Sequence, residues 1–301
     1  MIRKILFAVG LAAMLIGSSA LSESLADEKN VAAKPVIKSA KLSTGVTLEY
    51  AEQGDFNGVP LVLLHGYGDS RRSYDLLLSQ LPKSFHVYVL TQRGHGDSEH
   101  PASGYNARDY AADVAAFLDA VKSPKAVIVG HSLGSYIAQR FALDHPERVR
   151  GLVLIGSFVT VRGNSGVQEL WDSTISKLPE SADLAFIREF QQSTFHKPIS
   201  PEFFETVIRE SAKVPGRVWR AVMAELLKTD FSAELGRINA PTLIVWGDKD
   251  SFFLRAEQER LAKAIANSKL VIYEGIGHCP NWEAPERVAA DLTTFVERLG
   301  R

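Results

Sequence analysis

The stretch Gly130–Gly134, with the sequence Gly-His-Ser-Leu-Gly, most constrains how this chain folds. An apolar run at residues 125–129 precedes it and is typical of a buried strand, while residues 135–143 have the apolar spacing of a helix. The two glycines allow a turn that is too tight for bulkier side chains. On such a turn the hydroxyl of Ser132 is raised above a sheet at the positive end of a helix. We therefore expect Ser132 to be a nucleophile; an ordinary glycine-bounded turn is the alternative.

Short apolar runs alternate with helical segments along the rest of the chain. Residues 36–53 alternate in polarity around a turn, which indicates an antiparallel strand pair at a sheet edge. Further strands are expected at residues 61–64, 86–90, 126–129, 151–155, 242–246 and 270–273, with a last helix from about 285 to 299. This order predicts an α/β fold with a mostly parallel twisted sheet and helices on both faces.

The alternation stops between residues 158 and 236, where the pattern is helical throughout. We expect this section to be a helical cap inserted into an α/β core formed by residues 36–157 and 237–301. Its aromatic side chains would mostly form the core of the cap, with some of them in a pocket wall, and they favour an uncharged, small or medium substrate. These aromatic residues are Trp171, Phe186, Phe190, Phe195, Phe203, Phe204 and Trp219.

The first residues have the pattern of an export signal. A basic start, Met1–Lys4, precedes an apolar run at residues 5–17, and small residues follow at the positions that a signal peptidase reads. We expect residues 1–26 to be a signal peptide cleaved after Ala20 or Ala26, which would place the protein in the periplasm or outside the cell. The apolar run is short for a membrane span, so we expect no stable membrane insertion after cleavage, with a retained anchor as the alternative.

Composition excludes several other classes of function. The formal net charge is −1 and no dense basic run lies outside the signal, which argues against a nucleic-acid partner. The single cysteine, Cys279, excludes an internal disulfide, and we interpret it as a packing residue. No zinc-ligand spacing and no phosphate-binding glycine loop are present, so no metal and no cofactor are expected. The sequence does not indicate an oligomeric state.

Two loops after later strands carry a candidate acid and a candidate base. The loop after residues 242–246 holds Asp248 and Asp250, either of which could fix the tautomer of an imidazole and stabilise its charged form. We favour Asp250 and interpret Asp248 as a turn residue; alternatively, both cap the next helix. His278 follows residues 270–273 and is expected to be the general base. The chain order Ser, Asp, His suits this architecture.

Backbone groups would complete the site. The N–H groups of Tyr67, which follows the expected strand at residues 61–64, and of Leu133 could form an oxyanion hole. Residues 93–98, Arg-Gly-His-Gly-Asp-Ser, are interpreted as an organiser of a loop. A substrate contact from His95 or Asp97 is the alternative for that loop.

These motifs together resemble the α/β-hydrolase superfamily, in particular its capped branch of esterases, haloperoxidases and epoxide-hydrolase-like proteins with a serine nucleophile. The resemblance runs from about residue 36 to 299. The matching pieces are His65-Gly66, Arg93–Ser98, Gly130–Gly134, Gly247–Asp250, Gly277-His278 and Glu283–Glu286. It implies a nucleophile at Ser132, an acid at Asp250 and a base at His278. Epoxide hydrolases and haloalkane dehalogenases use Asp at the elbow, so Ser132 argues against both.

The resulting hypothesis is an exported serine hydrolase that cleaves a small or medium, mainly apolar carboxylic ester through an acyl-serine. A lactonase or C–C bond hydrolase with the same triad is one alternative, because this fold supports many reactions. A receptor or binding protein without catalysis is another, and it is disfavoured because the catalytic parts are all in place.

Overall fold

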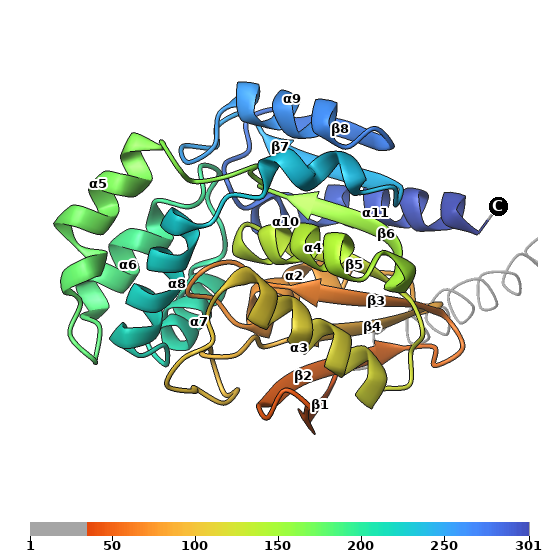
Figure 1. Ribbon diagram of the computed structural model, residues 1–301, viewed down its shortest axis with the longest axis horizontal. Coiled ribbons are helices and arrows are strands. Elements are labelled where there is room, and N and C mark those ends of the chain that lie inside the picture. Colours follow the sequence, from red (N-terminus) through yellow and green to blue (C-terminus); the bar gives the residue numbers. More distant parts are fainter. Residues whose placement is uncertain (1–34, 301) are drawn as a thin grey trace, which may run out of the picture. The chain divides into compact units, whose positions relative to one another are not determined.

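The computed structural model describes residues 35–300; the segment expected to be an export signal lies outside these residues. The chain forms an eight-stranded sheet in the order β1-β2-β4-β3-β5-β6-β7-β8 (Figure 1). The strands are β1 (Val36–Lys41), β2 (Thr47–Gly54), β3 (Val59–Leu64), β4 (Phe85–Leu90), β5 (Ala126–His131), β6 (Val149–Ile155), β7 (Thr242–Gly247) and β8 (Ser268–Tyr273). From β4 to β8 the neighbours are parallel, while β1 pairs with β2, and β2 with β4, in antiparallel fashion. The predicted mostly parallel sheet with an antiparallel edge is confirmed.

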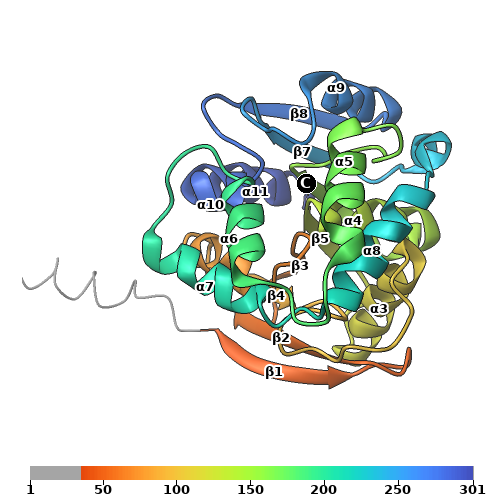
Figure 2. The ribbon, with the colours of Figure 1, turned by 90° about the vertical axis from the view of Figure 1, so that its left-hand side faces the viewer.

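Helices cover both faces of the sheet (Figure 2). Helices α3 (Ala107–Ala120), α4 (Leu133–Asp144) and α9 (Arg255–Ala264) pack on one face, and α2 (Asp75–Leu78) and α11 (Pro285–Leu299) on the other. Strand side chains alternate between the faces: Ile128 of β5 joins the first cluster, and Val127 and Val129 join the second. Burial on both faces explains why these strands read as continuous apolar runs.

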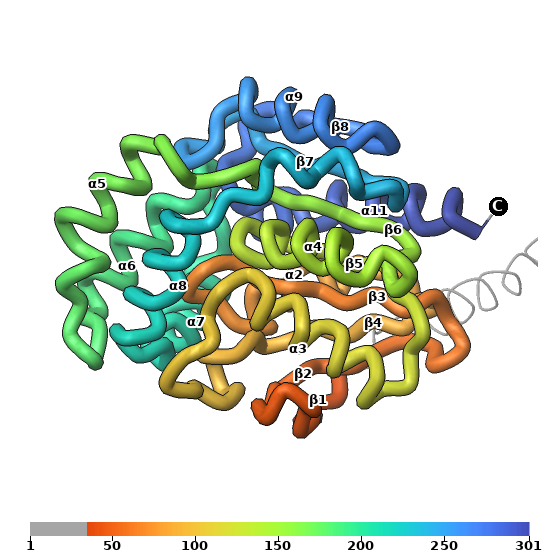
Figure 3. Tube along the Cα trace, in the orientation of Figure 1, coloured from red at the N-terminus to blue at the C-terminus, as the bar shows by residue number. Residues whose placement is uncertain are grey.

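Between β6 and β7 the chain leaves the sheet and forms a series of α-helices before it returns, as the tube in Figure 3 shows. They are α5 (Ser165–Ser173), α6 (Leu184–Gln192), α7 (Pro201–Ser211) and α8 (Gly216–Lys228), all within the range expected for the cap. Polar side chains cap three of them: Asn164 accepts from the backbone of α5, Asp183 from that of α6 and Ser200 from that of α7. We refer to residues 156–241 as the helical insertion.

None of the helices within residues 35–300 combines the length and apolar character needed to cross a membrane. Short helix α10 (Pro280–Glu283) follows β8 and leads into α11. The loops after β3, β5, β6, β7 and β8 all contribute to one pocket beside the helical insertion. The site is therefore built at the carboxyl ends of the parallel strands, as expected for an open α/β sheet.

Candidate active site

Ser132 occupies a strained turn between β5 and α4. Its φ of 50° and ψ of −114° lie in a region that L residues rarely adopt. A side-chain carbon on Gly130 would lie 2.2 Å from the carbonyl oxygen of Gly134, and one on Gly134 would lie 2.1 Å from that of Leu64. Both positions therefore require glycine because other backbone passes so close. Strain of this kind costs roughly 1–3 kcal/mol and is typical of functional sites.

The structure brings Ser132, His278 and Asp250 into one hydrogen-bonded chain. The Nε2 atom of His278 lies 2.9 Å from Oγ of Ser132, and its Nδ1 atom lies 2.8 Å from Oδ2 of Asp250. The side chain of Asp250 has no exposed surface and that of His278 has 6%, so this chain of bonds is shielded from bulk water. A buried carboxylate on Nδ1 holds the imidazole with Nε2 directed at the serine, which is the arrangement that activates a nucleophile.

Asp250 is oriented by its own loop. Its Oδ1 accepts hydrogen bonds from the backbone N–H groups of Phe252 at 2.8 Å and Phe253 at 3.1 Å, which leaves Oδ2 for the imidazole. Asp248 has a different role, because its Oδ1 accepts from the backbone N–H of Gly275. The geometry thus separates the two carboxylates that the sequence left in competition, with Asp250 at the imidazole and Asp248 in the turn.

The loop that carries His278 is held from two sides. The N–H of His278 donates to the carbonyl oxygen of Thr194 in the helical insertion at 3.0 Å. The carbonyl oxygen of His278 lies 3.0 Å from Nε2 of His131, the residue before the candidate nucleophile. Burial lowers the pKa of His131 to about 3, so its ring is neutral at ordinary pH and donates through Nε2. The backbone of the candidate base is therefore fixed to both the core and the insertion.

The two expected oxyanion donors are free to bind a ligand. Leu133 is the first residue of α4, where backbone N–H groups have no partner within the helix. Within residues 35–300, neither its N–H nor that of Tyr67 has an acceptor. The Tyr67 hydroxyl donates to the carbonyl oxygen of Trp219 in α8, and the two rings pack edge to face with centroids 4.6 Å apart. These contacts hold the loop that presents the Tyr67 amide.

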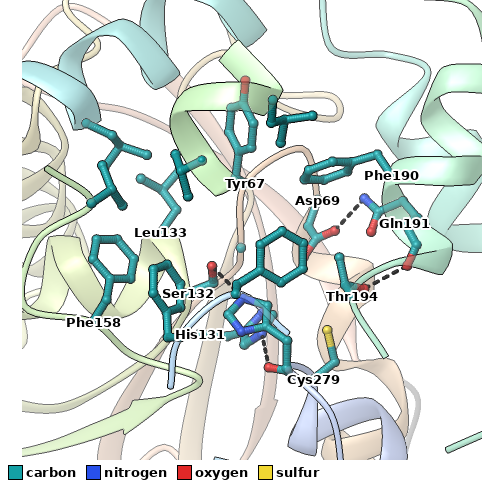
Figure 4. Close-up of a pocket in the computed structure, with 18 of the residues that line it drawn as sticks. Tyr67, Asp69, His131, Ser132, Leu133, Phe158, Phe190, Gln191, Thr194 and Cys279 are labelled. Carbon is teal, nitrogen blue, oxygen red and sulfur yellow. Dashed lines mark hydrogen bonds between the residues drawn. The ribbon is translucent and has the colours of Figure 1, made fainter. Parts of the chain in front are cut away.

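A pocket opens beside Ser132 and is mostly apolar (Figure 4). Its apolar wall comes from α5, α8 and the loops after β6 and β7. Residues of this wall are Phe158, Val167, Leu170, Met223, Leu226 and Phe253. Among the aromatic residues expected in the cap, Phe190 lines this pocket, and Phe186 lines an adjoining cavity together with Phe190. Trp219 instead packs behind Tyr67, which agrees with a mainly structural role for the cap aromatics.

Cys279 both packs and lines the pocket. Its side chain is fully buried and clusters with Phe203 of α7 and Trp282 of α10, as the interpretation of a packing residue requires. It also contributes to the pocket wall next to His278, which the sequence did not indicate. Burial raises the pKa of the Cys279 thiol well above its ordinary value, so the thiolate needed for nucleophilic attack is disfavoured.

The loop at residues 93–98 forms ion pairs with other segments and lies away from the pocket. Arg93 forms a buried ion pair with Asp113 of α3, its Nε lying 2.6 Å from Oδ2. Asp97 pairs with Lys213 at the surface, and His95 is buried. Neither His95 nor Asp97 is among the residues that line the pocket. No group of three or more His, Cys, Asp or Glu side chains in residues 35–300 is placed to hold a metal ion.

Three polar pocket residues were not predicted from the sequence: Asp69, Gln191 and Thr194, the last of which follows α6. Asp69 follows β3 in the same loop as Tyr67, and Gln191 lies at the end of α6. Asp69 could have been identified from its position, because it lies four residues after His65 in the loop that supplies an expected oxyanion donor. Nothing in the helical pattern of residues 184–192 distinguishes Gln191 from surface glutamines.

Comparison with known proteins identifies the family of this chain. The model of the alpha/beta hydrolase fold family matches residues 59–285. The chain is 27% identical over 276 residues to Lipase 1 of Psychrobacter immobilis, covering 86% of this chain and 83% of the lipase. It is 30% identical over 242 residues to a pimeloyl-[acyl-carrier protein] methyl ester esterase of Neisseria meningitidis, covering 78% of this chain and 76% of that protein.

A solved structure gives the same result for the fold. The esterase from Exiguobacterium antarcticum superposes with a TM-score of 0.79 at 22% identity, covering 87% of this chain and all of that one. The family model spans most of the chain, including the loops that carry Ser132, Asp250 and His278. This chain therefore belongs to the α/β-hydrolase fold family and is an enzyme of its esterase and lipase type.

Proposed function

We propose that this protein hydrolyses a small or medium, mainly apolar carboxylic ester through an acyl-enzyme on Ser132. The observation that carries the proposal is the hydrogen-bonded chain from Ser132 through His278 to Asp250, beside the free N–H groups of Tyr67 and Leu133. This arrangement provides a nucleophile, a base, an orienting acid and an oxyanion hole within one pocket.

The first half of the reaction acylates the serine. Oγ of Ser132 attacks the ester carbonyl carbon while Nε2 of His278 takes the hydroxyl proton, and Asp250 stabilises the imidazolium that forms. The N–H groups of Tyr67 and Leu133 hold the negative oxygen of the tetrahedral intermediate. The bond to the alcohol oxygen then breaks, and His278 passes its proton to that oxygen, so the alcohol leaves.

The second half releases the acid. A water molecule gives a proton to His278 and attacks the acyl carbon, and the same backbone donors hold the second oxyanion. Collapse of this intermediate breaks the bond to Ser132 Oγ, which recovers the proton from His278. The net reaction consumes one ester and one water and yields one acid and one alcohol, with no cofactor.

The pocket wall supports an apolar substrate and a role for the helical insertion as a cap. Val167 and Leu170 of α5 and Met223 and Leu226 of α8 lie in the wall beside Ser132. A second cavity between α5 and α6 shares Val167, Leu170, Phe190 and Phe252 with this pocket, which supports access of the substrate along it. The cap would then select substrates by size and keep bulk water from the acyl-enzyme.

Export is proposed from the sequence of the first residues alone, with cleavage after Ala20 or Ala26. Expression of the full chain in a bacterium, followed by fractionation and mass spectrometry of the N-terminus, tests this. A periplasmic or secreted protein that begins at Leu21 or Asp27 is expected. A cytoplasmic protein with an intact N-terminus would contradict export and would leave the proposed reaction unaffected.

The activity is tested with p-nitrophenyl esters of graded chain length, comparing the unmodified enzyme with Ser132→Ala. Loss of the nucleophile is expected to lower kcat by about a thousandfold or more, since only binding and the oxyanion hole remain. Ser173→Ala changes an exposed serine of α5 and is the matched control, for which unchanged kcat is expected. Full activity of Ser132→Ala would exclude the acyl-serine mechanism.

Labelling with an active-site phosphonate separates the alternatives if no ester is cleaved. Labelled Ser132 without ester turnover would point to a lactone or a C–C bond as the substrate. Absence of labelling would contradict an activated serine and would favour a binding protein.

A further inference from the structure

The carboxyl group of Asp69 is buried in the wall of the pocket without a positively charged side chain to pair with. Asp69 is 4% exposed, and its Oδ1 accepts a hydrogen bond of 3.0 Å from Nε2 of Gln191 in α6. Within residues 35–300, no Lys or Arg forms an ion pair with it. The proposed acyl-transfer steps do not use this group, so its presence in the pocket needs another explanation.

Keeping a carboxyl group in this position is costly for folding. Loss of hydration raises the pKa of Asp69 to about 7, against partial compensation from Gln191, the imidazole of His278, the backbone of Gly66 and the side chain of Ser73. The other titratable groups around it are Tyr74 of the short helix η1 (Arg71–Tyr74), His131 and Cys279, and none of them supplies a stable positive charge. An acid retained at a structural cost in a pocket is typical of a functional group.

Outside the chain of Ser132 and His278, the polar side chains of the pocket wall lie together on one side of the pocket. The polar part consists of Asp69 after β3, Gln191 in the last turn of α6 and Thr194 just after it. The apolar part comes mainly from α5, α8 and the loops after β6 and β7, together with Phe190 of α6. Figure 4 shows Asp69, Gln191 and Thr194 on one side of Ser132 and Phe158 and Leu133 on the other. A ligand that fills the whole pocket would meet the polar groups at one end, beside Phe190, and mainly apolar side chains at the other.

Gln191 fixes the position of the Asp69 carboxyl group. Both hydrogen-bonding contacts of its Nε2 are used, one to Oδ1 of Asp69 and one of 2.8 Å to Oγ of Ser211 in α7. Its backbone carbonyl accepts from Oγ1 of Thr194 at 2.8 Å. Gln191 is 1% exposed and held at both ends, so it fixes Oδ1 of Asp69. The backbone of Gly66 and the side chain of Ser73 also lie near the carboxyl group, but a carboxylate has about four acceptor sites and can still accept from a ligand in the pocket.

We propose that Asp69, oriented by Gln191, binds a hydroxyl group of the substrate, so that the enzyme prefers an ester with a hydroxyl on one side of the scissile bond and an apolar group on the other. A hydroxyl both donates and accepts, and it can therefore pair with the carboxyl group in either protonation state near neutral pH. This inference rests on the proposed ester hydrolysis. The competing explanation is that Asp69 only ties the core to α6 through Gln191.

The test uses two pairs of esters that differ by a hydroxyl in place of a methyl group. In the first pair, p-nitrophenyl 3-hydroxybutanoate and 3-methylbutanoate, the change is in the acid. In the second pair, 2-hydroxyethyl butanoate and propyl butanoate, the change is in the alcohol. At about pH 8 we expect kcat/KM to favour the hydroxyl compound by about tenfold or more in one pair, as a hydrogen bond to a charged group predicts. The favoured pair tells which part of the substrate carries the hydroxyl.

Three variants separate binding of the hydroxyl from a structural tie. Asp69→Leu is expected to bring the favoured ratio to about one, while Ser173→Ala, which changes an exposed serine of α5 outside the pocket, leaves the ratio unchanged. If Asp69→Leu does not fold, Asp69→Asn is the substitute, because its oxygen still accepts from Gln191. Its amide nitrogen cannot accept the hydroxyl proton, so the ratio falls by roughly threefold or more.

The outcomes distinguish this inference from the proposed function. Hydrolysis of the two apolar esters with no preference for the hydroxyl in either pair would overturn the inference and leave the esterase intact. The inference also fails if Asp69→Leu, or Asp69→Asn in its place, slows both members of the favoured pair equally, since a structural tie predicts that result. Inactivity toward all four esters would overturn the proposed function and the inference with it.

Discussion

The carboxylate of Glu283 accepts the backbone N–H of Gly277, the residue before the candidate base, at 2.9 and 3.0 Å from its two oxygens. The same carboxylate accepts the N–H groups of His196 at 3.0 Å and Lys197 at 2.6 Å in the helical insertion. One buried acid of α10 thus joins the loop of His278 to the insertion. The position of the imidazole and the position of the cap depend on the same group.

Replacement of this acid is expected to loosen the candidate base. Glu283→Gln removes the negative charge that accepts these N–H groups, and its amide N–H would face some of them as a second donor. We therefore expect the free energy of unfolding to fall by about 2 kcal/mol. We also expect kcat to fall by roughly tenfold, because small displacements of a catalytic group are costly. Thermal unfolding and ester turnover measure the two effects. Glu286→Gln, at an exposed position of α11, is the control, and equal effects of the two variants would contradict this role.

The two aspartates after β7 are expected to differ sharply. Asp250→Asn should lower kcat by about a thousandfold or more, because an amide favours the wrong imidazole tautomer and cannot stabilise the imidazolium. Asp248→Asn should stay within about threefold of the unmodified enzyme, since Asp248 bonds only to the next loop and to neighbouring Lys249. Steady-state kinetics on a p-nitrophenyl ester compares them. A larger loss in Asp248→Asn would show that the acid is assigned to the wrong residue.

Sequence alone located the parts of the fold that depend on local pattern. Residues 126–129 were expected to be a strand and lie in β5, because a strand buried on both faces needs an unbroken apolar run. The turn at Ser132 was predictable because close packing permits only glycine at Gly130 and Gly134. The resemblance to a known family implied the same nucleophile, acid and base that the individual loops had indicated.

Contacts between distant segments were not predictable in this way. Asp69 and Gln191 are 122 positions apart, and their hydrogen bond exists only because α6 packs against the loop after β3. The hydrogen bond from His278 to Thr194 also joins the core to the insertion. It is formed by backbone atoms, so the residue types at these positions do not indicate it. The choice between Asp248 and Asp250 needed coordinates for the same reason, since both residues follow β7 and both suit a turn.

Asp69 is expected to make stability depend on pH. Its pKa is raised to about 7 in the folded protein and is near 4 in the unfolded chain, so the folded state binds the proton more tightly. The stabilising effect of this proton is complete below about pH 4 and is lost as the pH rises through 7. Asp69→Asn removes the effect. Relative to the unmodified protein, this variant should therefore gain about 2–3 kcal/mol in unfolding free energy between about pH 5 and pH 8.

Urea unfolding of both proteins at the two pH values measures this difference. Asp172→Asn changes an exposed carboxylate of α5 and shows the effect of removing one negative charge from the surface. A difference between Asp69→Asn and the unmodified protein that does not change with pH would contradict a raised pKa for Asp69.

Val167 of α5 is expected to set the length of substrate that the pocket accepts. Its side chain is buried and lines both the pocket beside Ser132 and the adjoining cavity between α5 and α6. Tryptophan at this position would fill the passage between them, so kcat/KM for p-nitrophenyl decanoate should fall by about tenfold or more. The acetate ester does not need the passage and should change by less than about threefold.

Gln168→Trp is the matched control for this prediction, because Gln168 is the next residue of α5 and is exposed outside both cavities. It introduces the same side chain into the same helix without entering the passage, and its chain-length profile should match that of the unmodified enzyme. If Val167→Trp lowers turnover of acetate and decanoate alike, the substitution has disturbed the candidate site itself. Unchanged chain-length profiles for both variants would mean that the acyl chain extends from Ser132 in another direction. Tryptophan would then be introduced at Met223 or Leu226 in the α8 wall.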